Sequence, residues 1–400
     1  MIRKVAIAAA MAWTLVVTIL RAARLPNKFS TEHWLIDYRF GFVKRGLVGS
    51  VLSVVTGLAG TRPSERLIDA LAIAMFVIFC AALLYVALLV VRRSRWSTDM
   101  ALAALVFLSS PFVVMSAHLI GYYDNIVILL TLLSLALLFR RRVWAGAAVQ
   151  AVAILVHENA LLVGFPVFCW GAWLATRQAE PRRRALLPLL LPIAMFLLIA
   201  VRLTTAPHRL ERSLTAYLST YPFVADTIAD VRVPHWITIT FADSYTLHQG
   251  HFQERILSQP MIALVLPSVL ALLGVLFETQ GLAAISGESA LVLAICLVPQ
   301  SMHVMVWDTA RTWTYSIVCA FLVLWVDVEL RPLRRSASPF VILLALVALL
   351  MNVIGVTPLM DGVRERFDLT ARLIAYAPIL ALAGMLAGSA KASGERQPLG

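Results

Sequence analysis

The chain has 400 residues, of which 60% are hydrophobic and only 14% are charged, and its mean hydropathy is +0.85. No ordinary soluble domain is this apolar, so the composition indicates an all-α polytopic membrane protein. The formal net charge of +12 does not indicate a nucleic-acid partner, because arginine clusters between hydrophobic runs are what membrane topology requires. The four cysteines all fall inside apolar runs without metal-ligand spacing, which excludes a disulfide framework or a zinc site as the organising feature.

Hydrophobic runs long enough to cross a bilayer recur along the chain. They cover residues 4–23, 67–91, 98–118, 125–140, 185–203, 260–277, 289–306, 312–328, 338–356 and 371–388. The first run follows two basic residues as in a signal peptide, but it lacks a convincing small-residue cleavage site, so we interpret it as a retained span. The segment 143–176 lies between two arginine triplets that should both face the cytoplasm. It is therefore expected to cross twice, as two short helices broken at His157-Glu158-Asn159.

The arginine distribution predicts about twelve spans with both termini in the cytoplasm of a plasma (inner) membrane protein. The loops assigned to the cytoplasm carry Arg92, Arg93, Arg95, Arg140–Arg142, Arg182–Arg184, Arg331, Arg334 and Arg335. Loop 278–288 has no lysine or arginine, and its placement depends on its neighbours. We expect a single transmembrane domain, 1–400, whose outer loops 24–66 and 204–259 form the active-site face.

Both outer loops contain more than simple connections. Leu47–Gly60 is apolar but short and glycine-rich, which favours an interfacial or re-entrant helix over a span. Segment 204–259 is the largest polar stretch, and its aromatic content argues against disorder. We expect it to cover the outer surface, with a short helix at Ser213–Tyr221 and irregular structure elsewhere.

The stretch His33–Gly49, HWLIDYRFGFVKRGLVG, places one acid and three cations among aromatic residues just beyond the first span. The ionisable residues are Asp37, Arg39, Lys44 and Arg45. They could hold an anionic head group beside a carboxylate. The alternative is an interfacial aromatic belt with ordinary flanking charges.

Ionisable groups at membrane depth are costly and are by default functional candidates. Those near the outer ends of different spans are Asp37, Asp124, His157, Glu158, Asp308 and Arg311. Their placement predicts a site on the outer face. Two of them have simpler alternatives, because Glu158 could pair with an arginine to tie helices together and Asp124 could cap its helix.

Asp308 and Arg311 are three residues apart, so they would be neighbours on a helix. His303, Trp307 and Arg311 would then form an i, i+4 stripe. An arginine oriented by an aspartate and flanked by tryptophan suits phosphate, because guanidinium binds phosphate bidentately. A local ion pair would use the same residues.

An early outer-loop acid followed by basic residues, a further acid at the start of a later span, and outer-face arginine and histidine resemble polytopic glycosyltransferases of the GT-C type. The GFVKRGLVG run and the HEN break are also similar to uncharacterised bacterial polysaccharide-assembly membrane proteins. The resemblance covers the general layout of the chain. It implies a GT-C-like fold and transfer of a sugar from a polyprenyl-phosphate donor to a glycan, lipid or protein acceptor on the outer side of the membrane. It also implies that Asp37 is catalytic, and the lack of a large soluble C-terminal domain leaves acceptor recognition to 204–259.

The chemistry of such a transfer fits these residues. A carboxylate can deprotonate the acceptor hydroxyl, and we assign this role to Asp37, with Asp124 and Glu158 as alternatives. Cations stabilise the phosphate leaving group; the candidate substrate- and phosphate-binding residues are Arg39, Lys44, Arg45, His157, His303, Asp308 and Arg311. No cofactor is required, although Asp37, Asp124 and Glu158 could hold Mg or Mn, since hard cations choose oxygen ligands.

Two other functions remain open at this stage. A transporter or flippase of lipid-linked sugars would account for the break at His157-Glu158, but such proteins usually show internal repeats, and none is evident. An O-antigen-type polysaccharide polymerase would use the same class of substrate, and sequence does not separate it from a single-sugar transferase.

Overall fold

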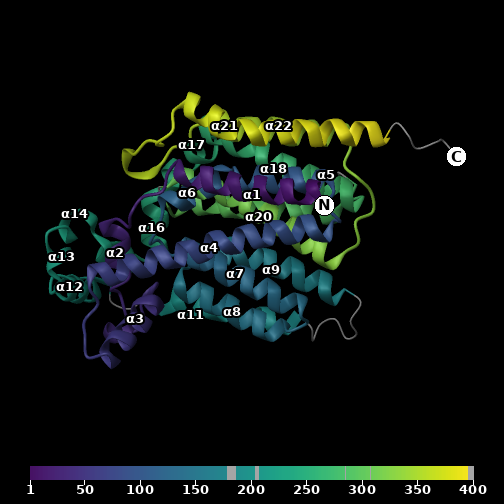
Figure 1. The fold of residues 1–400 in the computed structure, drawn as a ribbon. Helices are drawn as coiled ribbons and strands as arrows, with labels where there is room; N and C mark the ends of the chain where they lie inside the picture. Colours follow the sequence, from purple (N-terminus) through teal and green to yellow (C-terminus); the bar gives the residue numbers. More distant parts are fainter. Residues whose placement is uncertain (178–185, 203–206, 284, 307, 395–400) are drawn as a thin grey trace.

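The computed structural model describes residues 1–177, 186–202, 207–283, 285–306 and 308–394, and these residues form helices and connecting turns without a β-strand (Figure 1). The Arg182–Arg184 triplet lies outside the described residues. Buried apolar side chains from the first helix to the last form one large, continuous core. The chain is therefore a helical protein built around a shared core.

Within the described ranges, seven helical segments are long and apolar enough to cross a membrane. They are α1 (Ile2–Leu20), α4 (Glu65–Arg93), α5 with α6 (Thr98–Leu108 and Pro111–His118), α18 (Gln259–Gln280), α19 with η4 (Gly287–Leu297 and Val298–Val304), α20 (Thr309–Leu330) and α22 (Leu369–Gly394). The shorter apolar helices are α3 (Gly46–Leu58), α7 (Asp124–Phe139), α8 (Val143–Val156), α9 (Ala160–Thr176), α11 (Leu190–Arg202, after η2 at Leu187–Leu189) and α21 (Pro339–Ile354). The prediction of a multi-pass helical membrane protein is confirmed at this level.

The apolar helices lie alongside one another in a bundle, and both the N-terminus and the end of α22 lie at the same end of it (Figure 1). Short helices gather at the opposite end, which we call the cap end. They are α2 (Lys28–His33), η1 (Tyr38–Phe40), α12 (Pro207–Leu218), α13 (Pro222–Ala225), α14 (Ile228–Val231), α15 (Val233–Thr238), α16 (Phe241–His248), η3 (Gln249–His251), α17 (Phe252–Ile256) and η5 (Met360–Gly362). The expectation of irregular structure around Ser213–Tyr221 is wrong, because 207–256 folds into consecutive short helices.

Two breaks interrupt the apolar helices, one that the sequence predicted and one that it did not. The break at His157-Glu158-Asn159 is confirmed: α8 ends at Val156, α9 begins at Ala160, and the two helices contact each other as a hairpin. The run 98–118 is broken as well, because α5 ends before Ser109-Ser110 and Pro111 starts α6. Proline lacks the amide hydrogen that a continuous helix needs at this point.

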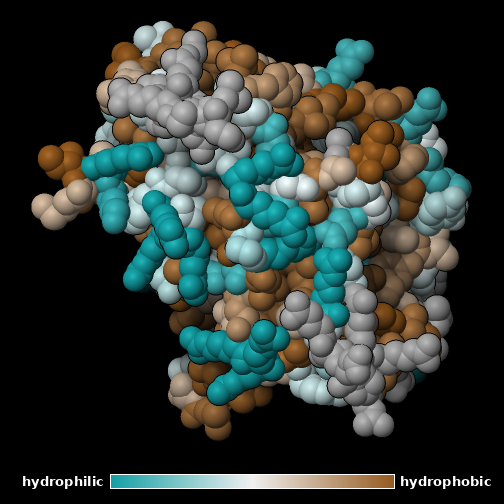
Figure 2. Space-filling model, turned by 90° about the vertical axis from the view of Figure 1, so that its right-hand side faces the viewer, coloured by the Kyte–Doolittle hydropathy of each residue, from teal (hydrophilic) through white to brown (hydrophobic). Residues whose placement is uncertain are grey.

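The end of the bundle that carries the chain termini is strongly basic. Figure 2 looks onto this end, where hydrophilic side chains gather across the middle of the face between apolar margins. Its exposed arginines include Arg92, Arg93, Arg95 and Arg140–Arg142. At the cap end, by contrast, many cations are paired with acids, as described below.

A buried ion pair connects the end of α1 to the segment between α21 and α22. Arg21 directly follows α1, and its Nε lies 2.8 Å from the Oε2 of Glu365, with both side chains almost fully buried. The guanidinium also donates to the carbonyls of Asn352 at the end of α21 and of Gly355 beyond it, at 2.7 and 2.9 Å. Arg21 therefore finds its hydrogen-bond acceptors at the end of α21 and in the α21–α22 connection.

Glu365→Gln is expected to destabilise the protein strongly, because it leaves the Arg21 cation buried without its counter-charge. Breaking a buried pair in this way costs about 3–5 kcal/mol. Thermal unfolding in detergent measures the loss. The matched control is Asp361→Asn, since Asp361 pairs with Arg24 but is 43% exposed; equal melting temperatures for the two variants would contradict the anchoring role of Arg21.

Candidate functional site

The GFVKRGLVG run is shaped by close backbone approach. A Cβ at Gly49 would lie 2.0 Å from the carbonyl oxygen of Ile36, so α3 can pack against the preceding loop only with glycine at this position. Arg45 immediately precedes α3 in the left-handed region, at φ 62°. A non-glycine residue adopts this conformation at an energetic cost, which is typical of functional positions. The backbone of Arg45 is therefore strained, and this strained conformation sets the position of its side chain.

Arg45 is paired with Glu158 from the α8–α9 turn. Its Nε donates to Glu158 Oε2 at 3.0 Å, and its Nη2 donates to Oε1. Its Nη1 lies 3.3 Å from the Nε2 of His33. Burial opposes ionisation of Glu158, but Arg45, with smaller contributions from His157 and Lys44, outweighs this effect and holds the pKa of that carboxyl well below its usual value. Glu158 is thus ionised and paired with Arg45, which agrees with the alternative that this acid ties helices together through an arginine.

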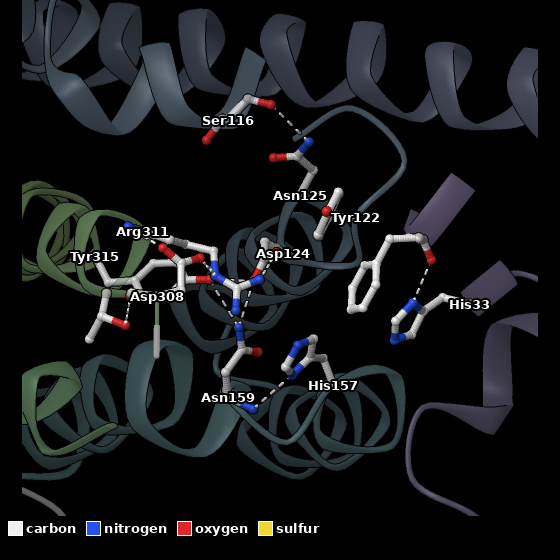
Figure 3. A network of polar contacts seen from close by, with 12 residues as sticks. His33, Ser116, Tyr122, Asp124, Asn125, His157, Asn159, Asp308, Arg311 and Tyr315 are labelled. Atoms are coloured by element: carbon white, nitrogen blue, oxygen red, sulfur yellow. Dashed lines mark hydrogen bonds and ion pairs between the residues drawn. The ribbon is translucent and has the colours of Figure 1, made fainter. Parts of the chain in front are cut away.

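A second network joins α7, α9 and α20 (Figure 3). Asp124 accepts from the hydroxyl of Tyr315, from Asn159 Nδ2 at 2.7 Å and from Arg311 Nη1 at 3.4 Å. Asp308 caps α20 by accepting from the backbone amide of Arg311, and its Oδ2 lies 2.8 Å from Arg311 Nε. Asp124 is the first residue of α7 and makes no capping hydrogen bond. Its carboxylate holds Arg311 instead.

Two cavities meet between these networks. The short helices α12 to α17 are here called the cap. The first cavity, called the polar cavity, has a volume of 490 Å³ and is lined by residues of α2, the turn before α7, the cap and η5. The second, the apolar cavity, has a volume of 360 Å³ and lies between α9, α11, the cap and the η4–α20 connection. Both are lined by Phe29, Arg45, His157, Trp236, Asp308 and Arg311. The shared residues therefore connect a polar and an apolar compartment.

The two histidines at this junction are neutral. Burial, with Arg45 as the next contribution, lowers the pKa of both His33 and His157 to about 3. The Nδ1 of His33 donates to the carbonyl of Phe29 at 2.8 Å, and the Nδ1 of His157 accepts from the backbone amide of Asn159 at 3.2 Å. His157 can therefore donate a hydrogen bond from Nε2, but it does not add a positive charge for a phosphate.

The structure does not bring every predicted residue to the cavities. Asp37 caps η1 and is bound by Arg39, whose Nε donates to both carboxylate oxygens at 2.8 Å. Arg39 also lies over the ring of Tyr217, and neither Asp37 nor Arg39 lines a cavity. Through Tyr217, the pair connects the α2–α3 segment to α12.

The predicted stripe through His303 and Arg311 is not formed. His303 lies in η4 and its Nε2 is 3.2 Å from Gln300 Oε1, whereas α20 begins only at Thr309. Trp307 lies outside the described residues. Asp308 and Arg311 are nevertheless neighbours, as predicted, because a cap residue and the third residue of a helix are within reach of each other.

The three acids that could hold a divalent cation each face a different arginine: Asp37 faces Arg39, Asp124 faces Arg311, and Glu158 faces Arg45. Across the described ranges, no group of three or more histidine, cysteine, aspartate or glutamate side chains is placed to hold a metal ion.

Several residues of the site were not predicted. His33, Asn159, Tyr315 and Trp236 all contact the networks or line the cavities. Tyr315 had a usable signal, since it follows Arg311 by four residues on an apolar helix. Trp236 had none, because its position depends on how the cap folds back over the bundle.

Comparison of the chain with protein-family models, with curated proteins and with solved structures finds no match.

Gly49→Ala is expected to destabilise the protein and to displace Arg45, because the new methyl group would overlap the Ile36 carbonyl. Gly57→Ala, in the same helix, meets no atom within 4 Å and should be neutral or stabilising by up to about 1 kcal/mol. Thermal unfolding of the two variants makes the comparison. Equal stability would show that the close approach at Gly49 is unimportant.

Proposed function

We propose that the protein transfers a sugar from a polyprenyl-phosphate donor to an acceptor at the cap end of the bundle. The observation that carries this proposal is the pair of adjoining cavities with cations in their linings. A lipid-linked sugar has an apolar chain, a phosphate and a polar head in that order, and the cavities offer matching surroundings in that order. Small-molecule sites are commonly of this size, mostly apolar, with a few well-placed polar groups.

The linings support this assignment. The part of the apolar cavity that the polar cavity does not share is lined largely by aliphatic and aromatic side chains: Leu161, Leu162, Phe196, Ile239, Phe241, Met302, Val304, Met305 and Val306. The corresponding part of the polar cavity is lined largely by hydrogen-bonding side chains: Asn27, Lys28, Ser30, His33, Tyr122, Tyr123, Asp230 and Asp361. The donor chain fits the first compartment, and the sugar with its acceptor fits the second.

In this mechanism Asp308 replaces Asp37 as the general base. Asp308 lines both cavities. Burial raises the pKa of its carboxyl against the opposing effect of Arg311, which makes it a stronger base than an ordinary aspartate. The acceptor oxygen would attack the anomeric carbon, its proton would pass to Asp308, and the bond to the phosphate oxygen would break. Glu158 is a poorer base, because Arg45 stabilises its ionised form.

Asp308→Asn is expected to reduce transfer by about 10²–10⁴-fold, the usual contribution of a general base. Asparagine is also a good helix cap, so α20 should stay intact. The rate of transfer is measured in proteoliposomes as the movement of labelled sugar from the polyprenyl-phosphate donor to the acceptor. Asp37→Asn is the control and should retain near-wild-type turnover.

Near-normal transfer by a folded Asp308→Asn protein would exclude the base role, and a large loss in Asp37→Asn alone would restore the assignment made from the sequence. Movement of the lipid-linked sugar across the bilayer without a new glycosidic bond would indicate a transporter instead.

The GT-C-like arrangement of about twelve spans is part of the same proposal. Seven crossings alone would leave the chain ends at opposite ends of the bundle, whereas both lie at the same end (Figure 1). The shorter helices α7, α8, α9, α11 and α21 pack against the long ones or against each other within the bundle, which supports five further crossings. The exposed arginines at the terminal end favour a cytoplasmic location for it, and the cap end then faces outward.

Cysteine labelling tests this orientation. Thr61 at the cap end and Arg142 at the opposite end are both exposed, so Thr61→Cys should react with an impermeant maleimide in intact cells and Arg142→Cys only after permeabilisation. The wild-type protein, whose four cysteines lie in apolar helices, is the control. Labelling of Arg142→Cys in intact cells would reverse the orientation.

A further inference from the structure

The cations that line the two cavities differ in whether they are neutralised. They are Lys28, Lys44, Arg45 and Arg311. Lys28 pairs with Glu65, Arg45 with Glu158, and Arg311 with both Asp124 and Asp308. Lys44 forms no ion pair with any residue that the structure describes. It is therefore the exception in an otherwise balanced site.

Lys44 is also deeply buried. The residue is only 5% exposed, and its Nζ donates to the carbonyl of Ile239 at 3.0 Å. The ring of Phe241 lies 5.8 Å from the same nitrogen. An ammonium group carries three hydrogens, so two donors remain for a ligand in the apolar cavity that Lys44 lines.

A buried cation without a counter-charge in direct contact is unfavourable, because burial removes its hydration. The nearby carboxylate of Glu158 offsets only part of this loss, since it is bound directly by Arg45. The same burial lowers the pKa of Lys44 to about 8. An anion that enters the cavity would relieve this penalty. The arginines are less suited to the task, since each would have to give up a carboxylate partner before it could bind an anion with the same donors.

We infer that Lys44 is the primary anchor for the phosphate of an isoprenoid lipid that lies in the apolar cavity. The ligand carries one phosphate group, because the second charged group of a diphosphate would meet no unpaired cation among the described residues of the cavities. The identity of the lipid as a sugar donor rests on the proposed function. Binding of the lipid phosphate itself does not.

Lys44→Met separates the two consequences of an unpaired cation. Methionine fills a similar volume without charge, so the ligand-free variant should melt at the same or a higher temperature than the wild type. Its affinity for polyprenyl phosphate should fall about 10–100-fold, the value of a hydrogen bond to a charged group. Thermal shift and native mass spectrometry in detergent measure both quantities. Lys28→Met, which removes an ion-paired cation of the polar cavity, should keep the affinity for polyprenyl phosphate.

The ligand panel identifies the source of the anion. Polyprenol should bind the wild type at least tenfold more weakly than polyprenyl phosphate, inorganic phosphate should give little stabilisation, and polyprenyl diphosphate should bind no more tightly than the monophosphate. Wild-type affinity in Lys44→Met would overturn the inference, as would equal stabilisation by inorganic phosphate or tighter binding of the diphosphate.

The result also separates this inference from the proposed function. Lys44-dependent binding without sugar transfer would leave the anchor in place and remove the transferase. Sugar transfer with unchanged lipid affinity in Lys44→Met would do the reverse.

Discussion

The cap end depends on the neutralisation of charge that has been taken out of water. Arg45 and Glu158 join the start of α3 to the α8–α9 turn, and Arg311 joins α20 to α7 through Asp124. Each buried ion pays a desolvation penalty that only a close counter-charge and further hydrogen bonds repay. Because the partners come from different helices, the helices must come together for the charges to be balanced.

The same requirement fixes the positions of the side chains in the site. Asn159, which precedes α9, and Tyr315 of α20 both donate to Oδ1 of Asp124 and so fix the orientation of its carboxylate. The strained backbone of Arg45 is held by the close packing of α3. Such preorganisation lowers the cost of binding, since fewer groups must be fixed when a ligand arrives. Lys44, which is buried and whose Nζ donates to the Ile239 carbonyl, keeps donors available to a ligand in the apolar cavity.

The cap makes the two compartments. Trp236 lines both cavities, while Ile239 accepts from Lys44 and Phe241 closes the apolar side. The cap is attached to α2 and η1 through stacking of Arg39 on Tyr217 and through the hydrogen bond of Thr227 to buried Glu32. The Asp37–Arg39 pair thus stabilises the support of the cavities from outside them.

Local patterns in the sequence determined the membrane class, most of the spans and the break at His157-Glu158-Asn159, because hydrophobicity and charge act over a few residues at a time. They also pointed to Arg45, Glu158, Asp308 and Arg311, since ionisable groups next to apolar runs are costly wherever they occur. Only the tertiary structure decided that Asp37 turns to its neighbour Arg39 while Asp308 faces the cavities. Neighbours in the chain do not show which buried acid meets which cation. That choice depends on helices far apart in sequence, which pack so that nearly every buried charge finds a partner.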